Sequence, residues 1–243
     1  MATAAGKRPG RPSKDAIRIR REDEILDAAV KLFAQRGYSD ANTQELADRL
    51  GVGKGTIYRY FPTKRDLFLA AVDRVIRGLI EAIDAAAESA DDPLHRMANA
   101  VKAYLGYFAE HPEFVELLIL ERAQFKDRQK PTYFVYKDAN AERRREAFRQ
   151  LIAEGRIRQM SVDRIIEVLS DLLYGTMFTN YFAGRNRSPE EQAKDILDVV
   201  FHGILSESER HAGQAAEHRH PSLALQASPK HESRRSAAER KGP

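Results

Sequence analysis

Two short runs of helical apolar spacing, separated by a glycine, constrain this sequence most strongly. The stretch from Asn42 to Phe61 reads NTQELADRLGVGKGTIYRYF, and its apolar or small residues recur at helical intervals on both sides of Gly51: Leu46, Ala47, Leu50, Val52, Ile57 and Tyr60. Asn42 can cap the first helix, with Glu45 at the capping-box position, and glycine permits a sharp corner. The stretch therefore predicts two helices that share a core and are joined by a tight turn.

The second of these helices carries long donors and hydroxyl groups, namely Lys54, Thr56, Tyr58 and Arg59. Such side chains suit phosphate oxygens and base edges in a DNA major groove. An amphipathic run ahead of the pair can close a three-helix core and has Gly37 just past its end; its apolar stripe is Ile25, Leu26, Ala29, Leu32 and Phe33. We interpret the three segments as a DNA-binding helix-turn-helix, with an ordinary helical hairpin as the alternative.

Between Ile25 and Phe68 the sequence resembles the TetR-type (AcrR-like) transcriptional regulators. It has ILDAAVKLFAQRGY at 25–38 and ELADRLGVGKGTIYRYFPTKRDLF at 45–68, which follow that family's signature. The resemblance implies that DNA is faced by Thr43, Lys54, Thr56, Tyr58, Tyr60 and Lys64, and we add Gly55 and Arg59 from the same run. Gly53 departs from the family's usual Ser at the cap of the recognition helix, which costs roughly a few tenths of a kcal/mol.

Positive charge is concentrated at the N-terminus. Residues 1–21 carry seven Lys or Arg and one Asp, and residues 6–12 are too rich in Gly, Pro and charge to fold alone. We expect a flexible basic arm over residues 1–21. Its Arg-Pro-Gly-Arg-Pro core resembles an AT-hook, in which Arg8 and Arg11 would enter the minor groove of A·T-rich DNA. A merely solubilising tail is the alternative.

The rest of the chain reads as helices. Apolar residues at three- and four-residue spacing predict one long helix from Lys64 to about Ala90. Pro93 and Pro112 favour new helix starts, and the further helices are expected at 93–109, 112–126, 131–154, 161–183 and 188–206. The predicted fold is all-α: a three-helix helix-turn-helix DNA-binding domain (22–68), a larger helical ligand-binding and dimerisation domain (69–207), and a disordered tail (208–243) whose histidines we do not expect to bind metal.

Aromatic and aliphatic residues cluster between Tyr104 and Tyr136. A helical pocket lined by aromatics with a few polar groups is the usual form of a ligand site, although any helical core looks similar. The family resemblance implies an effector site between the long helix and the helices after it. On that reading the lining residues would be Phe108, Phe125, Tyr133 and Phe134, with Glu121 and Arg122 as polar anchors or as an internal ion pair.

The last two predicted helices read as an assembly surface. Residues 161–183 are apolar on more than one face, and residues 188–206 carry a second apolar face. Two such helices meeting their symmetry mates would give a four-helix dimer interface, centred on Leu169, Leu173, Met177, Val200 and Ile204. Packing within a monomer is the alternative.

Enzyme motifs are missing from the sequence. Gly55 follows Gly53-Lys54 where a phosphate loop needs Ser or Thr, and there is no Gly-x-Ser-x-Gly elbow. The absence of Cys excludes disulfides and thiolate metal sites. No apolar run approaches the roughly 18 residues of a membrane span. We therefore expect no catalytic site, metal or cofactor, no membrane partner, and a cytoplasmic protein.

Together these patterns predict a ligand-responsive, dimeric DNA-binding transcriptional regulator. We expect a repressor that a small hydrophobic or drug-like organic effector releases from a palindromic operator, with efflux or lipid control as a guess. An effector-independent, A·T-preferring DNA-architectural protein is the alternative, and a helical interaction module that never contacts DNA is a second one.

Overall fold

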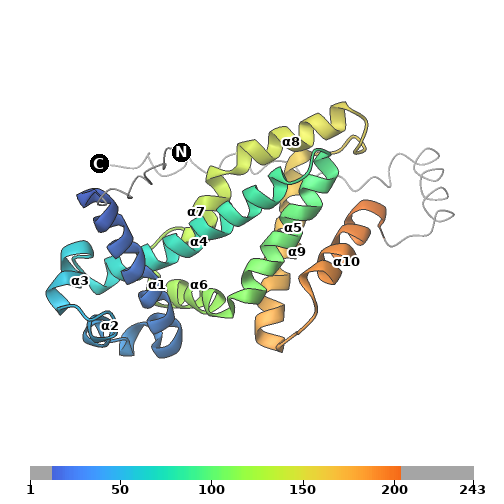
Figure 1. The fold of residues 1–243 in the computed structure, drawn as a ribbon. Helices are drawn as coiled ribbons and strands as arrows, with labels where there is room; N and C mark the ends of the chain where they lie inside the picture. The colour runs from blue at the N-terminus through green and yellow to red at the C-terminus, as the bar shows by residue number, and fades with distance from the viewer. Residues whose placement is uncertain (1–12, 204–243) are drawn as a thin grey trace, which may run out of the picture. The chain divides into compact units, whose positions relative to one another are not determined.

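The computed structural model describes residues 13–203, and the regular secondary structure in this range is entirely helical (Figure 1). The helices are α1 (Lys14–Asp40), α2 (Thr43–Arg49), α3 (Lys54–Tyr60), α4 (Lys64–Glu88), α5 (Pro93–Glu110), α6 (Pro112–Gln124), α7 (Thr132–Ala139), α8 (Ala141–Ala153), α9 (Val162–Ala183) and α10 (Pro189–His202). The predicted all-α class is confirmed. Arg8, Arg11, Ile204 and the predicted tail lie outside the described residues.

Local capping explains most of the helix starts. The Asn42 side chain accepts a hydrogen bond from the Gln44 amide (2.8 Å), and Thr63 and Asp66 form a reciprocal capping box at α4. Pro93 and Pro112 occupy first turns, as predicted. Gly37 has φ +72° and interrupts α1 where the sequence predicted the end of the first helix.

Two boundaries differ from the prediction. Residues 14–21 of the predicted arm are helical, because Ser13 caps α1 and Glu24 pairs with Arg20 (3.1 Å) and Arg21 (2.9 Å) one turn earlier. The predicted helix 131–154 is two helices, since the backbone leaves helical geometry at Asn140, whose side-chain amide donates to the Tyr136 carbonyl (3.0 Å). The second difference creates the separate helix α8.

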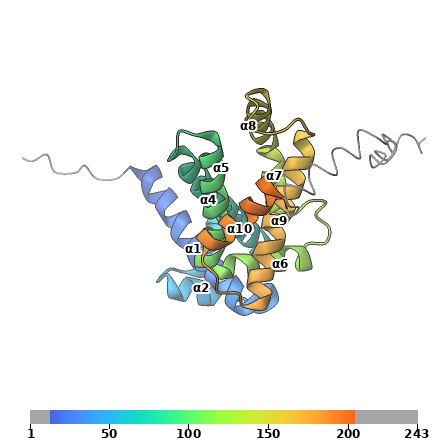
Figure 2. The ribbon, with the colours of Figure 1, turned by 90° about the vertical axis from the view of Figure 1, so that its right-hand side faces the viewer.

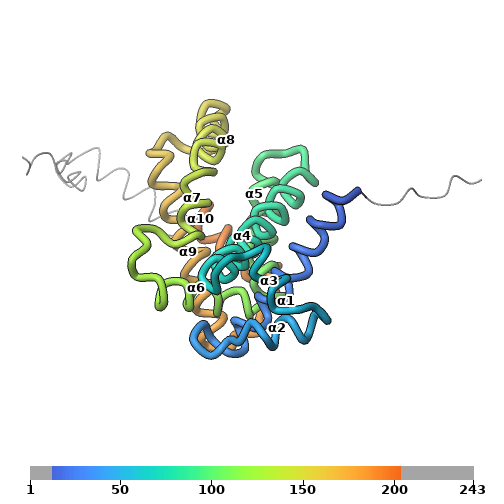
Figure 3. Tube along the Cα trace, turned by 90° about the vertical axis from the view of Figure 1, so that its left-hand side faces the viewer, coloured from blue at the N-terminus to red at the C-terminus, as the bar shows by residue number. Residues whose placement is uncertain are grey.

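The helix α4 joins the two predicted domains. At its N-terminal end it packs on α1, and Figure 3 shows α1, α2 and α3 gathered there. Farther along it packs on α5 and α7. One continuous cluster of buried residues runs from Ile25 to Leu197, so the core does not break at the predicted boundary after Phe68. The helix α4 therefore contributes buried residues both beside the helix-turn-helix and in the larger helical part.

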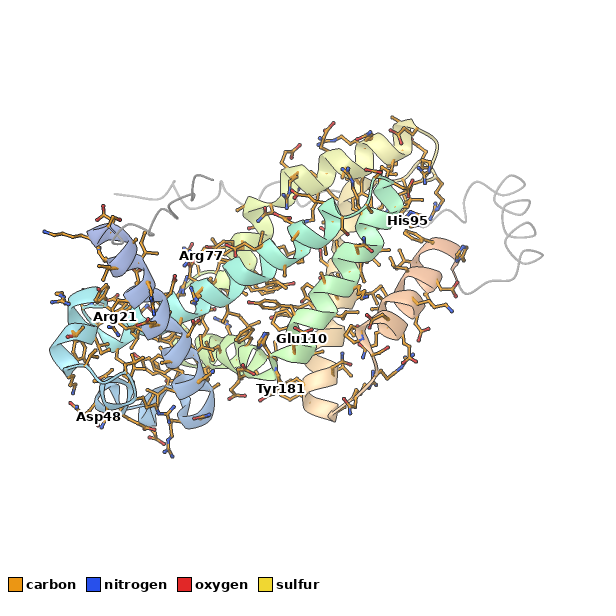
Figure 4. The ribbon with its side chains drawn as sticks, in the orientation of Figure 1. Arg21, Asp48, Arg77, His95, Glu110 and Tyr181 are labelled. Atoms are coloured by element: carbon orange, nitrogen blue, oxygen red, sulfur yellow. The ribbon has the colours of Figure 1, made fainter. Side chains whose placement is uncertain are left out.

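The remaining helices complete the larger part of the fold. The helix α9 packs against α5, α6 and α8 (Figure 2). Side chains fill the space between α4 and α5, where His95 marks the first turn of α5 and Glu110 its last residue (Figure 4). Of the described residues, those up to Leu197 belong to one compact unit, and residues 198–203 belong to a second. Within residues 13–203, none of the helices combines the length and hydropathy required to span a bilayer.

Candidate nucleic-acid interface and ligand cavity

The segment from α2 to α3 forms the predicted helix-turn-helix. Gly51 adopts φ +63°, and the amides of Gly51 and Val52 donate to the carbonyls of Asp48 (3.2 Å) and Ala47 (3.0 Å). These bonds close the end of α2 and turn the chain into α3. Gly53 precedes α3 without a side-chain cap, as expected for a residue that has none to offer.

The helix α3 is anchored on one side and open on the other. Ile57 is fully buried in the hydrophobic core. The predicted DNA-facing residues of α3 are exposed or half-buried: Lys54, Gly55, Thr56, Tyr58, Arg59 and Tyr60. The Lys54 ammonium lies 5.8 Å from the centre of the Tyr58 ring, which places both on one face. The structure thus brings these residues together as a donor-rich outer surface.

Thr43 has a different environment from the one predicted. Its side chain is 5% exposed, and its Oγ1 lies 3.0 Å from the hydroxyl of Tyr58. A buried threonine offers DNA little surface, so the predicted direct contact is not supported. The geometry indicates instead that Thr43 holds the Tyr58 ring in position.

Lys64 is already engaged within the chain. Its Nζ donates to the carbonyl of Ser39 (2.9 Å) and lies 5.1 Å from the centre of the Tyr38 ring. An ammonium has three donors, so this bond leaves two for a phosphate. Lys64 therefore ties the start of α4 to the end of α1 at the edge of the predicted interface.

A cavity of about 500 Å³ lies between α4, α5, α7, α8 and α9. Its apolar lining includes Ile76, Leu79, Ile80, Ile83, Met97, Val101, Phe148, Leu151, Ile166, Leu169 and Leu173. Tyr104 and Tyr133 place their hydroxyls 3.1 Å apart in the wall. Burial raises the pKa of Tyr133 to about 12 and the pKa of Tyr104 well above its usual value. Both phenols are therefore neutral donors at physiological pH.

Only Tyr133 among the predicted ligand residues lines this cavity. Phe108 packs against Tyr107 and Tyr104, Phe125 packs against Tyr38 and Phe68, and Phe134 packs against Tyr174. Arg122 is exposed. These residues therefore do not line this cavity, and Phe125 instead joins the end of α6 to α1 and α4. The cavity is lined by residues of α4, α5, α7, α8 and α9, and its apolar lining is mostly aliphatic.

Glu121 is buried for a structural reason. Its carboxylate is 1% exposed and accepts hydrogen bonds from Arg128 (2.7 Å), the Thr132 hydroxyl (2.7 Å) and the Thr132 amide (3.0 Å). These bonds fix the connection between α6 and α7. The predicted internal pair with Arg122 is wrong, because the next residue on a helix points in another direction and Arg128 takes that place.

The apolar surface of α9 is rotated from the predicted one. Leu169 and Leu173 line the cavity, and Met177 is 2% exposed and accepts a hydrogen bond from Tyr104 (3.7 Å). These three side chains therefore face the subunit's own interior. The exposed apolar residues of α9 are Val168, Leu172 and Phe182. On α10, Val200 is half-buried, and Val199 and Phe201 are exposed.

Among residues 13–203, there is no group of three or more His, Asp or Glu side chains placed to hold a metal ion. The polar surface of α3 and the mostly apolar cavity are two features with binding character. The first suits a polyanion, and the second suits a small molecule with a large apolar surface.

Residues 25–71 match the model of the family described as bacterial regulatory proteins, tetR family. The HTH-type transcriptional activator FasR of Mycolicibacterium smegmatis is 34% identical over 118 residues, which cover 47% of this chain and 53% of FasR. The HTH-type transcriptional repressor KstR2 of Mycobacterium tuberculosis is 24% identical over 77% of this chain and 94% of KstR2. The chain thus spans about half the length of the first curated relatives that it matches.

Similarity to solved structures extends over the larger helical part. The transcriptional regulator FadR from Bacillus subtilis, solved in complex with stearoyl-CoA, superimposes with a TM-score of 0.62. The match covers 75% of this chain and 99% of FadR at 18% sequence identity, which shows a shared fold. The helices beyond the helix-turn-helix therefore share their arrangement with those of FadR.

Proposed function

We propose that this chain, whose residues 25–71 form a DNA-binding domain of the tetR family, is a homodimeric transcriptional regulator that a small apolar effector releases from a palindromic operator. The observation that carries the proposal is the donor-rich outer surface of α3, held on the buried Ile57. A short helix fixed in this way can enter a major groove and present Lys54, Thr56 and Tyr58 to bases and phosphates. We expect the chain to repress transcription.

The path from cavity to DNA runs along α4. Residues from Ile76 to Glu88 line the cavity, while Leu67 and Phe68 at the other end are buried beside the helix-turn-helix. Arg74, between them, pairs with Asp23 (2.5 Å) and Asp27 (2.6 Å) of α1. A ligand that displaces the part of α4 lining the cavity would therefore move α1 and α3 as well. The affinity for DNA falls if, in the ligand-bound dimer, the distance between the two α3 helices no longer matches the spacing of successive major grooves.

Dimerisation supplies the second recognition helix. Two recognition helices must lie about 34 Å apart, or a multiple of that distance, to enter successive major grooves. The exposed Val168, Leu172 and Phe182 of α9 give an apolar surface that a second copy would cover. This surface replaces the predicted set on the inner side of the same helix.

The relatives support an effector with a long apolar part. FadR was solved with stearoyl-CoA, whose acyl chain is apolar, and the cavity here is lined chiefly by aliphatic side chains. We therefore favour a lipid-like effector over a flat aromatic drug. The relatives include an activator, FasR, and a repressor, KstR2, so reporter expression with and without the chain is the measurement that assigns the sign of regulation.

Sequencing the DNA fragments retained by the purified full chain, with and without a metabolite extract, tests the proposal. We expect a palindromic motif to be enriched, and the extract to reduce its retention. Fragments sharing only A·T content would favour the architectural alternative. Failure to retain any DNA at physiological salt would overturn the proposal.

A further inference from the structure

We propose that the cavity takes an amphipathic anion, an apolar body with a carboxylate or phosphate head, and that Arg144 of α8 binds the head. This inference rests on the proposed effector function of the same cavity. It concerns the chemistry of the ligand, which neither the fold nor the helix-turn-helix determines.

The charged residues of the cavity wall are predominantly basic. Four cationic side chains line it, and two carboxylates oppose them: Arg96, Lys137, Arg143 and Arg144 against Asp84 and Glu88. Apolar walls strengthen the effect of such an imbalance on an occupant, because they lower the local dielectric constant. The cavity therefore favours a negatively charged occupant over a neutral or cationic one.

Three consecutive arginines on α8 have different partners. Arg143 forms a two-pronged ion pair with Asp84, with one contact of 3.0 Å. Arg145 pairs with Asp163 (2.7 Å) and Glu142 (3.3 Å), and it does not line the cavity. Arg144 donates to the backbone carbonyl of Lys137, a neutral acceptor. Among the three, Arg144 alone faces the cavity without a carboxylate in hydrogen-bond contact.

The guanidinium of Arg144 is also under-satisfied. Its Nε is buried and has no hydrogen-bond partner. Burial lowers the pKa of Arg144, Tyr133 opposes this shift, and the neighbouring Arg143 and Arg145 charges add to it, although the group remains cationic. A half-buried cation with a buried, unpartnered donor costs folding energy unless an anion compensates it. A ligand head group in the cavity would supply that anion.

The other cationic groups of the wall are paired with a carboxylate or exposed to solvent. Lys137 lies 3.8 Å from Asp171 and 5.9 Å from the centre of the Phe134 ring. Arg96 is exposed, and its Nε donates to the Ala90 carbonyl (2.7 Å). Tyr133 also lines the cavity, and its neutral hydroxyl lies 3.1 Å from that of Tyr104. Arg144 and Tyr133 together form a polar end, and the aliphatic residues of α4 and α5 receive the apolar body.

The test measures binding of dodecanoate, dodecyl phosphate and dodecanol to the full chain by calorimetry, below the concentrations at which micelles form. We expect both anions to bind more than about tenfold tighter than the alcohol, because charge-assisted hydrogen bonds are about twice as strong as neutral ones. Arg144→Gln should reduce the affinity for both anions to that for dodecanol. The matched Arg145→Gln variant should retain the preference.

Each contrary result is informative. Equal binding of dodecanol and the anions by the wild-type chain would overturn the inference, and this comparison needs no variant to fold. Loss of the preference in Arg145→Gln to the same extent as in Arg144→Gln would overturn the role of Arg144. Absence of binding by all three would overturn the amphiphile itself. Operator binding without ligand, measured on the same samples, shows separately whether the proposed regulatory function holds.

Discussion

The hydroxyl of Tyr58 on α3 lies 3.0 Å from Oγ1 of Thr43, the first residue of α2. This contact joins the two helices of the helix-turn-helix at the surface where DNA is proposed to bind. Since Thr43 is buried and Tyr58 is half-buried, the hydrogen bond sets the direction of the tyrosine ring. We therefore propose that Thr43, which the family resemblance placed against DNA, acts through Tyr58.

We expect Thr43→Val to weaken DNA binding by about fivefold, since one hydrogen bond is worth about 1 kcal/mol and valine preserves the shape. Tyr58→Phe should cause a similar loss if the hydroxyl serves only this contact. Fluorescence anisotropy with a retained DNA fragment measures both. The double variant should then show no additional loss, and full additivity of the two effects would refute the coupling.

Lys64→Ala should weaken binding to every DNA sequence, because its ammonium has free donors for phosphate beside the bond to Ser39. The slope of log affinity against log salt should fall by about 0.9 for each phosphate that the variant no longer neutralises. Lys54→Ala should instead change sequence preference, since Lys54 lies on the exposed side of α3. An unchanged salt slope in Lys64→Ala would contradict its phosphate role.

Glu121→Gln should destabilise the fold by about 2 kcal/mol, because a buried carboxylate that receives bonds from Arg128 and Thr132 is replaced by a neutral amide. Arg122→Gln, the neighbouring exposed position, should change the free energy of unfolding by less than about 0.5 kcal/mol. Urea unfolding measures both values. Equal effects would mean that Glu121 is not the group that fixes the connection between α6 and α7.

Val168→Asp should raise the dimer dissociation constant by more than about tenfold, since the dimer would have to bury a charge on α9. Val135→Asp is the matched control, because Val135 is 46% exposed on α7 and Val168 is 52% exposed. Sedimentation velocity distinguishes the two variants. A dimer unaffected by Val168→Asp, or dissociated equally in Val135→Asp, would place the interface elsewhere.

The sequence was most informative where one pattern permits one structure. Apolar spacing on both sides of Gly51 predicted α2, α3 and the turn, because a glycine with positive φ and two short helical stripes leave few arrangements. It was less informative for α9, which is apolar on several sides. Periodicity alone could not show that Leu169, Leu173 and Met177 face inward and Val168 faces outward.

The cavity was harder still to predict. Its wall includes α8, which begins at Ala141 because the chain breaks helical geometry at Asn140, and a run of Arg143, Arg144 and Arg145 does not look like a pocket. The aromatic residues predicted to line a ligand site, such as Phe108 and Phe125, pack in the core instead.

The most direct measurement is a footprint of the full chain on a DNA fragment that it retains, repeated with Tyr58→Ala. The proposed function predicts two protected half-sites related by a twofold axis, with centres one or more helical turns of about 34 Å apart. It predicts that Tyr58→Ala abolishes both together while the protein stays folded by circular dichroism. Protection that persists in folded Tyr58→Ala, or a single unpaired site, would contradict the claim that two copies of α3 read the DNA.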